Sequence, residues 1–256
     1  MKKTLVSNEL QQNCKFAIIE AGKIALDLQK KIKVQYKSKN QPVTNADIEI
    51  NNFLFDFFKK KTPNFGWLSE ESLDDKSRFE SNFFWCLDPI DGTRAYLKNK
   101  PEYSISVALL LDNEPVIGVV SNPQTGEFFH ALSGKGAKEG KKTIKVSNLR
   151  QLEKSKIYIS NQEIAKLQHI MKPSQPHIQP ISSIAYKLSL VAMGSGDAAI
   201  SVSKKSDWDI AAAHIIIKEA EKSLSEFEDE LYSEIQKDKN WGFEKVFLNG
   251  ENLSFG

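Results

Sequence analysis

The stretch that decides the fold is Phe83–Thr93, which reads FFWCLDPIDGT. Its apolar first half predicts a buried β-strand that leads directly into Asp88. Pro89 is expected to end the hydrogen-bonded ladder of this strand, because proline has no N–H group to donate. Asp91 stands three residues after Asp88, just before a Gly-Thr turn. The pattern predicts two carboxylates and several backbone N–H groups directed at one point, which suits hard divalent cations and phosphates.

The same residues also fit a purely structural turn. Asp-Pro and Asp-Gly pairs are common in turns, and an aspartate often caps the helix that follows. In the functional interpretation the carbonyl of Ile90 also points inward, and the N–H groups of Gly92 and Thr93 begin a helix that suits a phosphate. The motif alone leaves both interpretations open, so the choice depends on ligands from elsewhere in the chain.

The composition is that of an ordinary globular protein. The chain has 256 residues, of which 40% are hydrophobic and 27% charged, enough for one large or two modest domains. Its net charge is only +2 and its lysines are scattered, so we expect no nucleic-acid partner. Cys14 and Cys86 lie outside any zinc-type spacing and are expected to be buried free thiols. Without a signal-peptide core or a membrane span, a soluble, cytoplasmic protein is expected.

Periodicity predicts two differently organised halves, separated by the Gly- and Lys-rich stretch 133–150. The first is an α+β part over 1–145, in which two helices lie beside an antiparallel meander: helices over 4–30 and 47–61, a short strand over 32–36, a polar loop over 37–41, and strands over 66–69, 83–88, 103–111, 115–122 and 127–131. The second is an α/β part over 146–256: strands over 156–160 and 197–202, helices over 161–171, 184–193 and 207–220, and edge elements after 221.

Acidic residues elsewhere each have a simple structural explanation. Glu70 and Glu71 follow a short predicted strand, where adjacent acids usually form a solvated loop. Asp47 begins one predicted helix and Asp209 another, so both fit helix caps. Their combination with the Phe83–Thr93 motif is much more specific than any one of them.

This combination resembles the inositol monophosphatase superfamily of magnesium-dependent, lithium-sensitive phosphatases. The matching blocks stand in the family's order at Pro42–Asp47, Trp67–Ser72, Asp88–Thr93 and Trp208–Ala212. Within the superfamily the chain looks most like the CysQ branch of 3′(2′),5′-bisphosphate nucleotidases. Three further features carry that likeness: Arg94, the segment Pro101–Ala108, and Ser182-Ser183 ahead of Lys187.

The resemblance implies a layered α-β-α-β-α sandwich that holds two or three Mg²⁺ ions. In it, Glu70, Asp88 and the carbonyl of Ile90 would hold one ion, and Asp88, Asp91 and Asp209 would hold a second. All of these groups are hard oxygens, which suit Mg²⁺ rather than zinc. Paired cations would neutralise the phosphate and lower the pKa of a bound water, so that no covalent nucleophile is required.

The resemblance also implies the catalytic and substrate-binding residues. Asp47 would accept a hydrogen bond from Thr93, and the Thr93 hydroxyl and Glu70 would orient and help deprotonate the attacking water. The C-terminal part would supply Asp209 and substrate-facing loops, and a homodimer is compatible with the family. The residues expected to contact a small phosphorylated substrate are Asp91, Gly92, Thr93, Arg94, Ser183 and Asp209.

Three other classes of protein compete with this interpretation. Haloacid-dehalogenase phosphatases also end a signature in Asp-Gly-Thr, but they need an aspartate two residues before Asp91, where this chain has Pro89. A non-catalytic metal- or nucleotide-binding protein would be favoured by the loss of Asp47, Glu70 or Thr93, and all three are present. A nucleic-acid-binding module would need a basic or aromatic face that the sequence lacks.

The sequence therefore predicts a Mg²⁺-dependent phosphomonoesterase. The first choice of substrate is adenosine 3′,5′-bisphosphate, because Arg94, Lys98 and Lys100 favour a highly charged molecule, and the second is inositol monophosphate. The chain departs from the family after the Trp-Asp helix, where Glu221-Lys222 replaces the usual Gly-Gly pair. Those glycines shape a turn, so the geometry of the C-terminal segment is left open, as is the role of Glu71.

Overall fold

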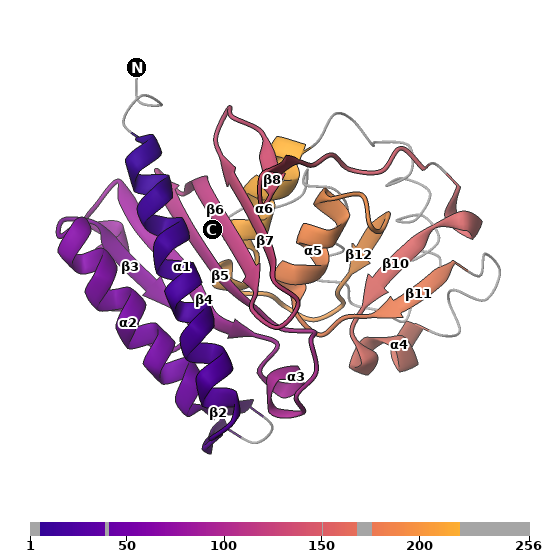
Figure 1. Cartoon of the computed structure of the whole chain (residues 1–256), viewed down its shortest axis with the longest axis horizontal. Coiled ribbons are helices and arrows are strands. Elements are labelled where there is room, and N and C mark those ends of the chain that lie inside the picture. The colour runs from indigo at the N-terminus through magenta and orange to yellow at the C-terminus, as the bar shows by residue number, and fades with distance from the viewer. Residues whose placement is uncertain (1–5, 39–40, 150, 168–175, 221–256) are drawn as a thin grey trace.

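A computed structural model describes residues 6–38, 41–149, 151–167 and 176–220 of the chain. Across these ranges the elements form stacked layers (Figure 1). A central sheet has α1 (Asn8–Gln29) and α2 (Asn45–Lys61) on one face, and α5 (Ile184–Ala192) and α6 (Asp207–Ala220) on the other. A smaller sheet and α4 (Asn161–Leu167) complete the stack. The predicted layered architecture is thereby confirmed.

The two N-terminal helices each begin at a side-chain cap. Ser7 caps α1 by accepting a hydrogen bond from the N–H of Leu10 at 3.1 Å. Thr44 caps α2 in a capping box with Asp47, in which each side chain accepts from the other residue's backbone. The buried side of α1 consists of small and branched residues that allow close packing: Cys14, Ala17, Ile18, Ala21 and Ala25.

Within the described residues the central sheet has seven strands, in the order β3-β4-β5-β6-β7-β8-β9. Their bounds are Gly66–Ser69, Phe83–Asp91, Ser104–Leu111, Glu114–Asn122, Glu127–Leu132, Ala137–Glu139 and Lys142–Thr143. All neighbours pair antiparallel except β3, which runs parallel to β4. The predicted meander is therefore wrong at β3, because residues 70–82 carry the chain back across the sheet before β4 begins.

The expectation that Pro89 ends its strand is also wrong. Strand β4 runs on to Asp91, and its register against β5 shifts between the pairs Asp88–Ser106 and Asp91–Ser104. Two residues of β4 thus face one residue of β5, which is a β-bulge. A bulge leaves one residue outside the ladder, so proline fits there without losing a hydrogen bond.

The small sheet is parallel, as expected for an α/β arrangement. In the part of the chain that is described, β10 (Lys156–Ile159) lies between β11 (His177–Pro180) and β12 (Ala198–Ile200). Strand β11 was not predicted, and residues 168–171 of the predicted 161–171 helix lie outside the described residues. The replacement Glu221-Lys222 and the tail that follows it also lie outside them.

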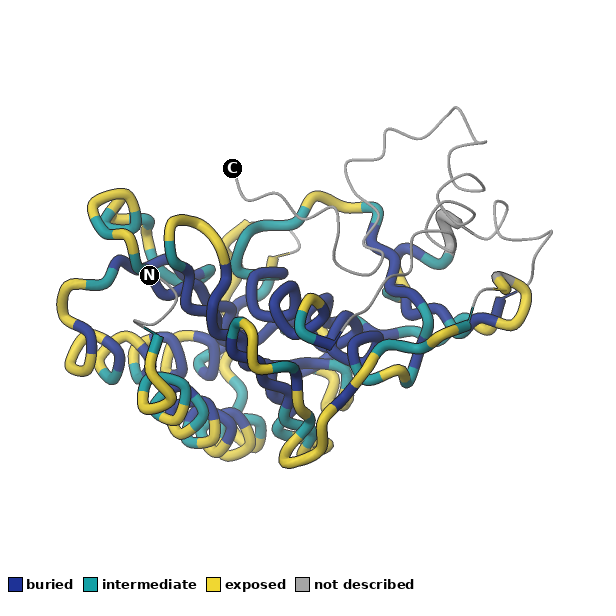
Figure 2. The backbone as a smooth tube through the Cα atoms, turned by 90° about the horizontal axis from the view of Figure 1, so that it is seen from above, coloured by how far each residue is buried: buried dark blue, intermediate teal, exposed yellow. Residues whose placement is uncertain are grey.

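Both halves of the chain contribute to one core cluster. It joins side chains of β4 and β5 to those of α5 and α6, and Figure 2 shows that burial is concentrated along these central layers. The division at residue 145 remains a proposal, and in the structure it separates the two sheets while α5 and α6 pack against the central one. In the described ranges, no helix combines the length and apolarity needed to cross a membrane.

A two-stranded hairpin lies apart from these sheets. Its strands are β1 (Val34–Ser38) and β2 (Gln41–Thr44), so the predicted polar loop over 37–41 is wrong at both ends. Exposed polar residues mask the strand pattern, because β1 is exposed on both faces. The short helix α3 (Thr93–Leu97) follows β4 directly.

Candidate metal centre

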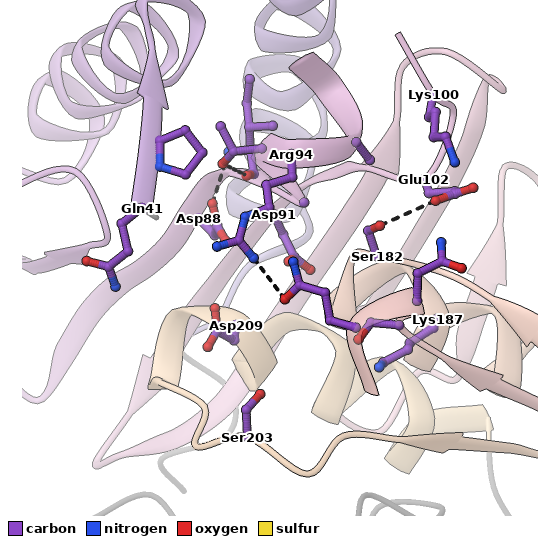
Figure 3. Close-up of a pocket in the computed structure, with 18 of the residues that line it drawn as sticks. Gln41, Asp88, Asp91, Arg94, Lys100, Glu102, Ser182, Lys187, Ser203 and Asp209 are labelled. Carbon is purple, nitrogen blue, oxygen red and sulfur yellow. Dashed lines mark hydrogen bonds between the residues drawn. The ribbon is translucent and has the colours of Figure 1, made fainter. Parts of the chain in front are cut away.

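The end of β4, the loop after β3 and the first turn of α6 meet at one cavity of about 480 Å³. Figure 3 shows carboxylates from β4 and α6 pointing toward one another at one side of it. One oxygen each of Asp88, Asp91 and Asp209 lies within 4.8 Å of the others. The structure therefore brings Asp209 of α6 beside Asp88 and Asp91 of β4, although Asp209 stands more than 100 residues later in the chain.

The bulge in β4 places two of these carboxylates in a nearly solvent-free position. Asp88 is 2% exposed and Asp91 is 7% exposed. Asp88 accepts a hydrogen bond from the N–H of Ile90 at 2.9 Å, which closes the turn of the bulge. Burial, together with neighbouring carboxylates, raises the pKa of Asp88 well above its usual range.

Asp209 both caps its helix and belongs to the acidic cluster, the two roles that its sequence position suggested. Its Oδ2 accepts from the N–H of Ser206 at 2.8 Å, a bond that caps the first turn of α6. The same carboxylate also belongs to the acidic cluster. Burial and the neighbouring Asp91 raise the pKa of Asp209 to about 7.

Asp47 and Thr93 come together although they are far apart in the chain. The Thr93 hydroxyl lies 3.4 Å from Asp47 Oδ1 and 3.1 Å from the carbonyl oxygen of Ile90. A hydroxyl has one hydrogen, so Thr93 donates to only one of these acceptors at a time. Burial raises the pKa of Asp47 to about 6, although its hydrogen bonds from Thr44 oppose the shift.

Glu70 and Glu71 share a cation that was not anticipated as part of the site. Lys37 of β1 places its Nζ 3.2 Å from Glu70 Oε1 and 2.6 Å from Glu71 Oε1. Glu70 lines the cavity but lies outside the tight group of three aspartates. Burial raises the pKa of Glu71 to about 7 despite the opposing effect of Lys37. Because Lys37 stands on an exposed hairpin, its charge was the one sequence signal that could have identified it.

Ser183 makes a different contact from the one expected of it. It is fully buried, its Oγ donates to Asp91 Oδ2 at 2.6 Å, and it lies 3.0 Å from Ser104 Oγ. In the structure this hydroxyl faces Asp91, and the cavity lining includes Ser182 rather than Ser183, so the substrate contact of Ser183 stays a prediction. The neighbouring Ser182 lines the cavity and donates to Glu102 Oε2 at 3.3 Å.

Gly92 and Arg94 both line the cavity, and their contact with a substrate stays a prediction. Gly92 has φ 95°, and a Cβ there would lie 2.9 Å from the carbonyl oxygen of Glu102. Only glycine fits this combination of a left-handed backbone and a close approach. Arg94 Nη1 donates to Gln162 Oε1 at 2.9 Å across the cavity (Figure 3).

The side of the cavity away from the aspartates carries a buried lysine that sequence reasoning gave no role of its own. Lys187 is 1% exposed, and its Nζ donates to the carbonyl oxygen of Ile200 at 2.7 Å. Its Nζ also lies 3.8 Å from Glu163 Oε2. Burial lowers the pKa of Lys187 to about 8. A lysine inside the apolar helix α5 was the signal that could have predicted this pair.

The chemistry of the site fits Mg²⁺. Carboxylates, together with the Ile90 carbonyl, form a set of hard oxygens, and the pKa values of the buried aspartates are raised because burial and like charges oppose ionisation. A divalent cation would offset both effects. Cationic side chains on the surrounding cavity wall would in turn attract an anionic substrate: Lys37, Arg94, Lys98, Lys100, Lys187 and Lys205.

Comparison with known proteins agrees with this geometry. The family model for the inositol monophosphatase family matches residues 6–233. The 3′(2′),5′-bisphosphate nucleotidase CysQ of Aggregatibacter actinomycetemcomitans is 29% identical over 201 residues, covering 75% of this chain and 74% of that protein. Inositol monophosphatase 3 of Solanum lycopersicum is 28% identical over 199 residues, covering 73% of this chain and 74% of that protein.

A solved structure shows the same fold. The extragenic suppressor protein suhB of Bartonella henselae superposes with a TM-score of 0.76 at 26% identity, covering 83% of this chain and 85% of that chain. The family match covers well over half of the sequence and includes every residue of the acidic cluster. The chain therefore belongs to the inositol monophosphatase family, whose members are magnesium-dependent phosphatases.

Proposed function

We propose that this protein hydrolyses a small phosphate monoester by activating water with two Mg²⁺ ions. The observation that carries the proposal is the convergence of Asp88, Asp91 and Asp209, whose oxygens lie within 4.8 Å of one another in a cavity of about 480 Å³. Such a cavity is large enough for a nucleotide-sized ligand. A binding protein without catalytic activity would not need the Thr93–Asp47 pair beside this cluster.

The metal ligands would come from three segments of the chain. Glu70, Asp88 and the carbonyl of Ile90 would hold one Mg²⁺, and Asp88, Asp91 and Asp209 would hold a second. When bound, the ions would neutralise the phosphate, lower the pKa of the attacking water and stabilise the leaving oxygen. A third ion is compatible with the family but is not required by this geometry.

Side chains and backbone groups of the protein would carry out the proton transfer and bind the phosphate. Thr93 Oγ would accept the proton of the attacking water as its own hydrogen moves toward Asp47 Oδ1, 3.4 Å away. Asp47 is suited to receive it because its pKa is raised to about 6. Glu70 would orient the water, and the N–H groups of Gly92 and Thr93 would donate to the phosphate.

For the substrate, we propose adenosine 3′,5′-bisphosphate, which would yield AMP and phosphate. Support comes from the cationic wall of the cavity, where Arg94, Lys98 and Lys100 would favour a second phosphate, and from the likeness to CysQ. Inositol monophosphate is the alternative, supported by the likeness to inositol monophosphatase 3. Lithium sensitivity, a homodimer and a cytoplasmic location belong to the same proposal and rest on family membership.

Phosphate release from a panel of substrates would test the proposal. The panel contains adenosine 3′,5′-bisphosphate, inositol monophosphate, fructose 1,6-bisphosphate and histidinol phosphate, each with and without Mg²⁺ and Li⁺. We expect Mg²⁺-dependent release, fastest from the nucleotide and inhibited by Li⁺. Faster release from inositol monophosphate would favour the alternative substrate. No Mg²⁺-dependent release from any of the four would favour a non-catalytic metal- or nucleotide-binding protein.

A further inference from the structure

Helix α2 presents a second buried polar side chain to the site, one turn after Asp47. Asn51 is 5% exposed, and its Oδ1 accepts hydrogen bonds from Ser69 Oγ at 2.7 Å and from Ser72 Oγ at 3.2 Å. These two serines stand on either side of the Glu70-Glu71 pair. A single amide oxygen on α2 therefore anchors both ends of the short loop that carries the two glutamates.

The bonds continue from the anchor into the loop itself. Ser69 Oγ accepts from the N–H of Glu71 at 3.3 Å. On the opposite side, the N–H of Glu70 donates to the carbonyl oxygen of Leu87 in β4 at 3.3 Å. The loop is thus held by β4 on one side and by Asn51 on the other. Helix α2 packs against β4 (Figure 1), and its Phe55 ring contacts Trp67 of β3.

Packing alone does not account for Asn51. The neighbouring buried positions of α2 are filled by apolar residues such as Ile50 and Leu54, and an apolar residue would fill position 51 as well. An amide is useful there because it satisfies the two buried or half-buried hydroxyls that flank the glutamates. The same helix face also carries Asp47, so α2 holds two parts of the site at a fixed spacing along one rigid element.

We propose that Asn51 is a positioning residue that holds Glu70 where it can bind a metal ion. The inference rests on the proposed function in one respect, namely that Glu70 is a metal ligand. Lys37 gives the anchor its importance, because its ammonium binds Glu70 and Glu71 from the hairpin side. Without Asn51 the loop would keep its bond to Leu87 of β4 but lose the opposing anchor, so Lys37 would draw the Glu70 carboxylate away from Asp88 and weaken metal binding.

The test compares two single substitutions on neighbouring positions of α2. Asn51→Ala removes the anchor, and Asn52→Ala removes the same type of side chain from an exposed position whose contact with Asn51 is a long 3.4 Å bond. Mg²⁺ binding is measured by isothermal titration calorimetry without substrate. We expect the dissociation constant to rise about tenfold in Asn51→Ala, the usual scale for losing a residue that orients a ligand, and to change less than twofold in Asn52→Ala.

A melting curve without metal separates the positioning role from a structural one. If Asn51→Ala melts at a lower temperature but binds Mg²⁺ with unchanged affinity, Asn51 serves the fold alone and the inference is wrong. If Asn51→Ala does not fold, Ser72→Ala decides, because it removes one of the two anchored hydroxyls at a half-buried position. A weaker Mg²⁺ affinity in Ser72→Ala supports the inference, and an unchanged affinity overturns it.

Calorimetry also keeps this inference distinct from the proposed function. If the unmodified protein binds Mg²⁺ but hydrolyses no substrate of the panel, the proposed function fails while the role of Asn51 is still decided by the affinities. If hydrolysis occurs and Asn51→Ala leaves the Mg²⁺ affinity unchanged, the proposed function stands and the positioning role fails.

Discussion

Asp91 has both a structural role, as a hydrogen-bond acceptor, and a proposed chemical role, as a metal ligand. One of its oxygens accepts from Ser183 Oγ at 2.6 Å and from the N–H of Ala185 at 2.7 Å. Burial raises its pKa, and these two hydrogen bonds oppose the shift. The carboxylate is therefore held in place by α5 before any metal binds. A bound cation would favour its ionised form and so lower its pKa.

The substitution Asp91→Asn separates the hydrogen-bonding role of this side chain from its negative charge. The amide oxygen still accepts both hydrogen bonds, but the negative charge is lost. We expect phosphate release to fall by more than about 10²-fold, the scale of losing one preorganised charge in a site of this kind. The melting temperature without metal is expected to stay the same or rise, because a like charge leaves the cluster. Activity close to that of the unmodified protein would contradict the metal assignment.

At the scale of elements, Glu163 ties the beginning of α4 to the segment that leads into α6. It accepts from Ser160 Oγ at 2.6 Å, from Ser201 Oγ at 2.8 Å and from the N–H of Val202 at 2.8 Å. Burial alone would raise its pKa, but the ammonium of Lys187 and these hydrogen bonds lower it to about 2. The network connects the small sheet to the first turn of α6, where Asp209 stands.

Glu163→Gln should destabilise the protein because it leaves Lys187 buried without its counter-charge. Breaking a buried pair from one side typically costs about 3 kcal/mol of unfolding free energy. Urea unfolding at pH 7 measures the loss, and the double variant Glu163→Gln/Lys187→Met should recover part of it. The pKa of Glu163 is lower when folded than when unfolded, so its contribution is present above about pH 4.5 and is lost as the pH falls toward 2. An equally stable single variant would show that the pair contributes nothing.

At the scale of the whole molecule, the acidic site opposes folding in the absence of metal. The folded-state pKa values of Asp47, Glu71 and Asp209 lie at about 6, 7 and 7, well above their usual values of 3.8 or 4.5. The folded protein therefore holds more protons than the unfolded chain as these groups titrate, so their contribution to stability is lost as the pH rises through 7. Buried His130 and His214 have lowered pKa values of about 4 and act in the opposite direction, mainly below pH 6.5.

Melting curves at two pH values test this balance. In EDTA we expect a lower melting temperature at pH 8 than at pH 6.5, because the acidic groups dominate above the range of the histidines. Saturating Mg²⁺ should raise the melting temperature more at pH 8, where it binds carboxylates that are already ionised. Asp91→Asn is the matched control and should weaken both effects. A melting temperature in EDTA that is independent of pH would contradict the prediction.

Local patterns in the sequence were sufficient for the elements and for the identity of the central motif. Apolar periodicity predicted α1, α2, α5, α6 and the strands β4 to β7, because each pattern is set by near neighbours in the chain. The acidic blocks pointed to one oxygen-rich site, and the structure brings Asp88, Asp91 and Asp209 together. The helices, the strands and the three-residue spacing of Asp88 and Asp91 depend on near neighbours in the chain, which a sequence displays directly.

Only the tertiary structure decided the pairings that join distant segments. The parallel course of β3, the bulge that accommodates Pro89, and the contact of Ser183 with Asp91 all depend on how the chain returns to itself. The same holds for Lys37 on its hairpin and for Asn51 on α2, whose partners lie 18 or more residues away. Composition and motifs thus determined which chemical groups the site contains. Their contacts were decided by long-range packing, because the partner of a buried polar side chain is whichever group the fold brings beside it.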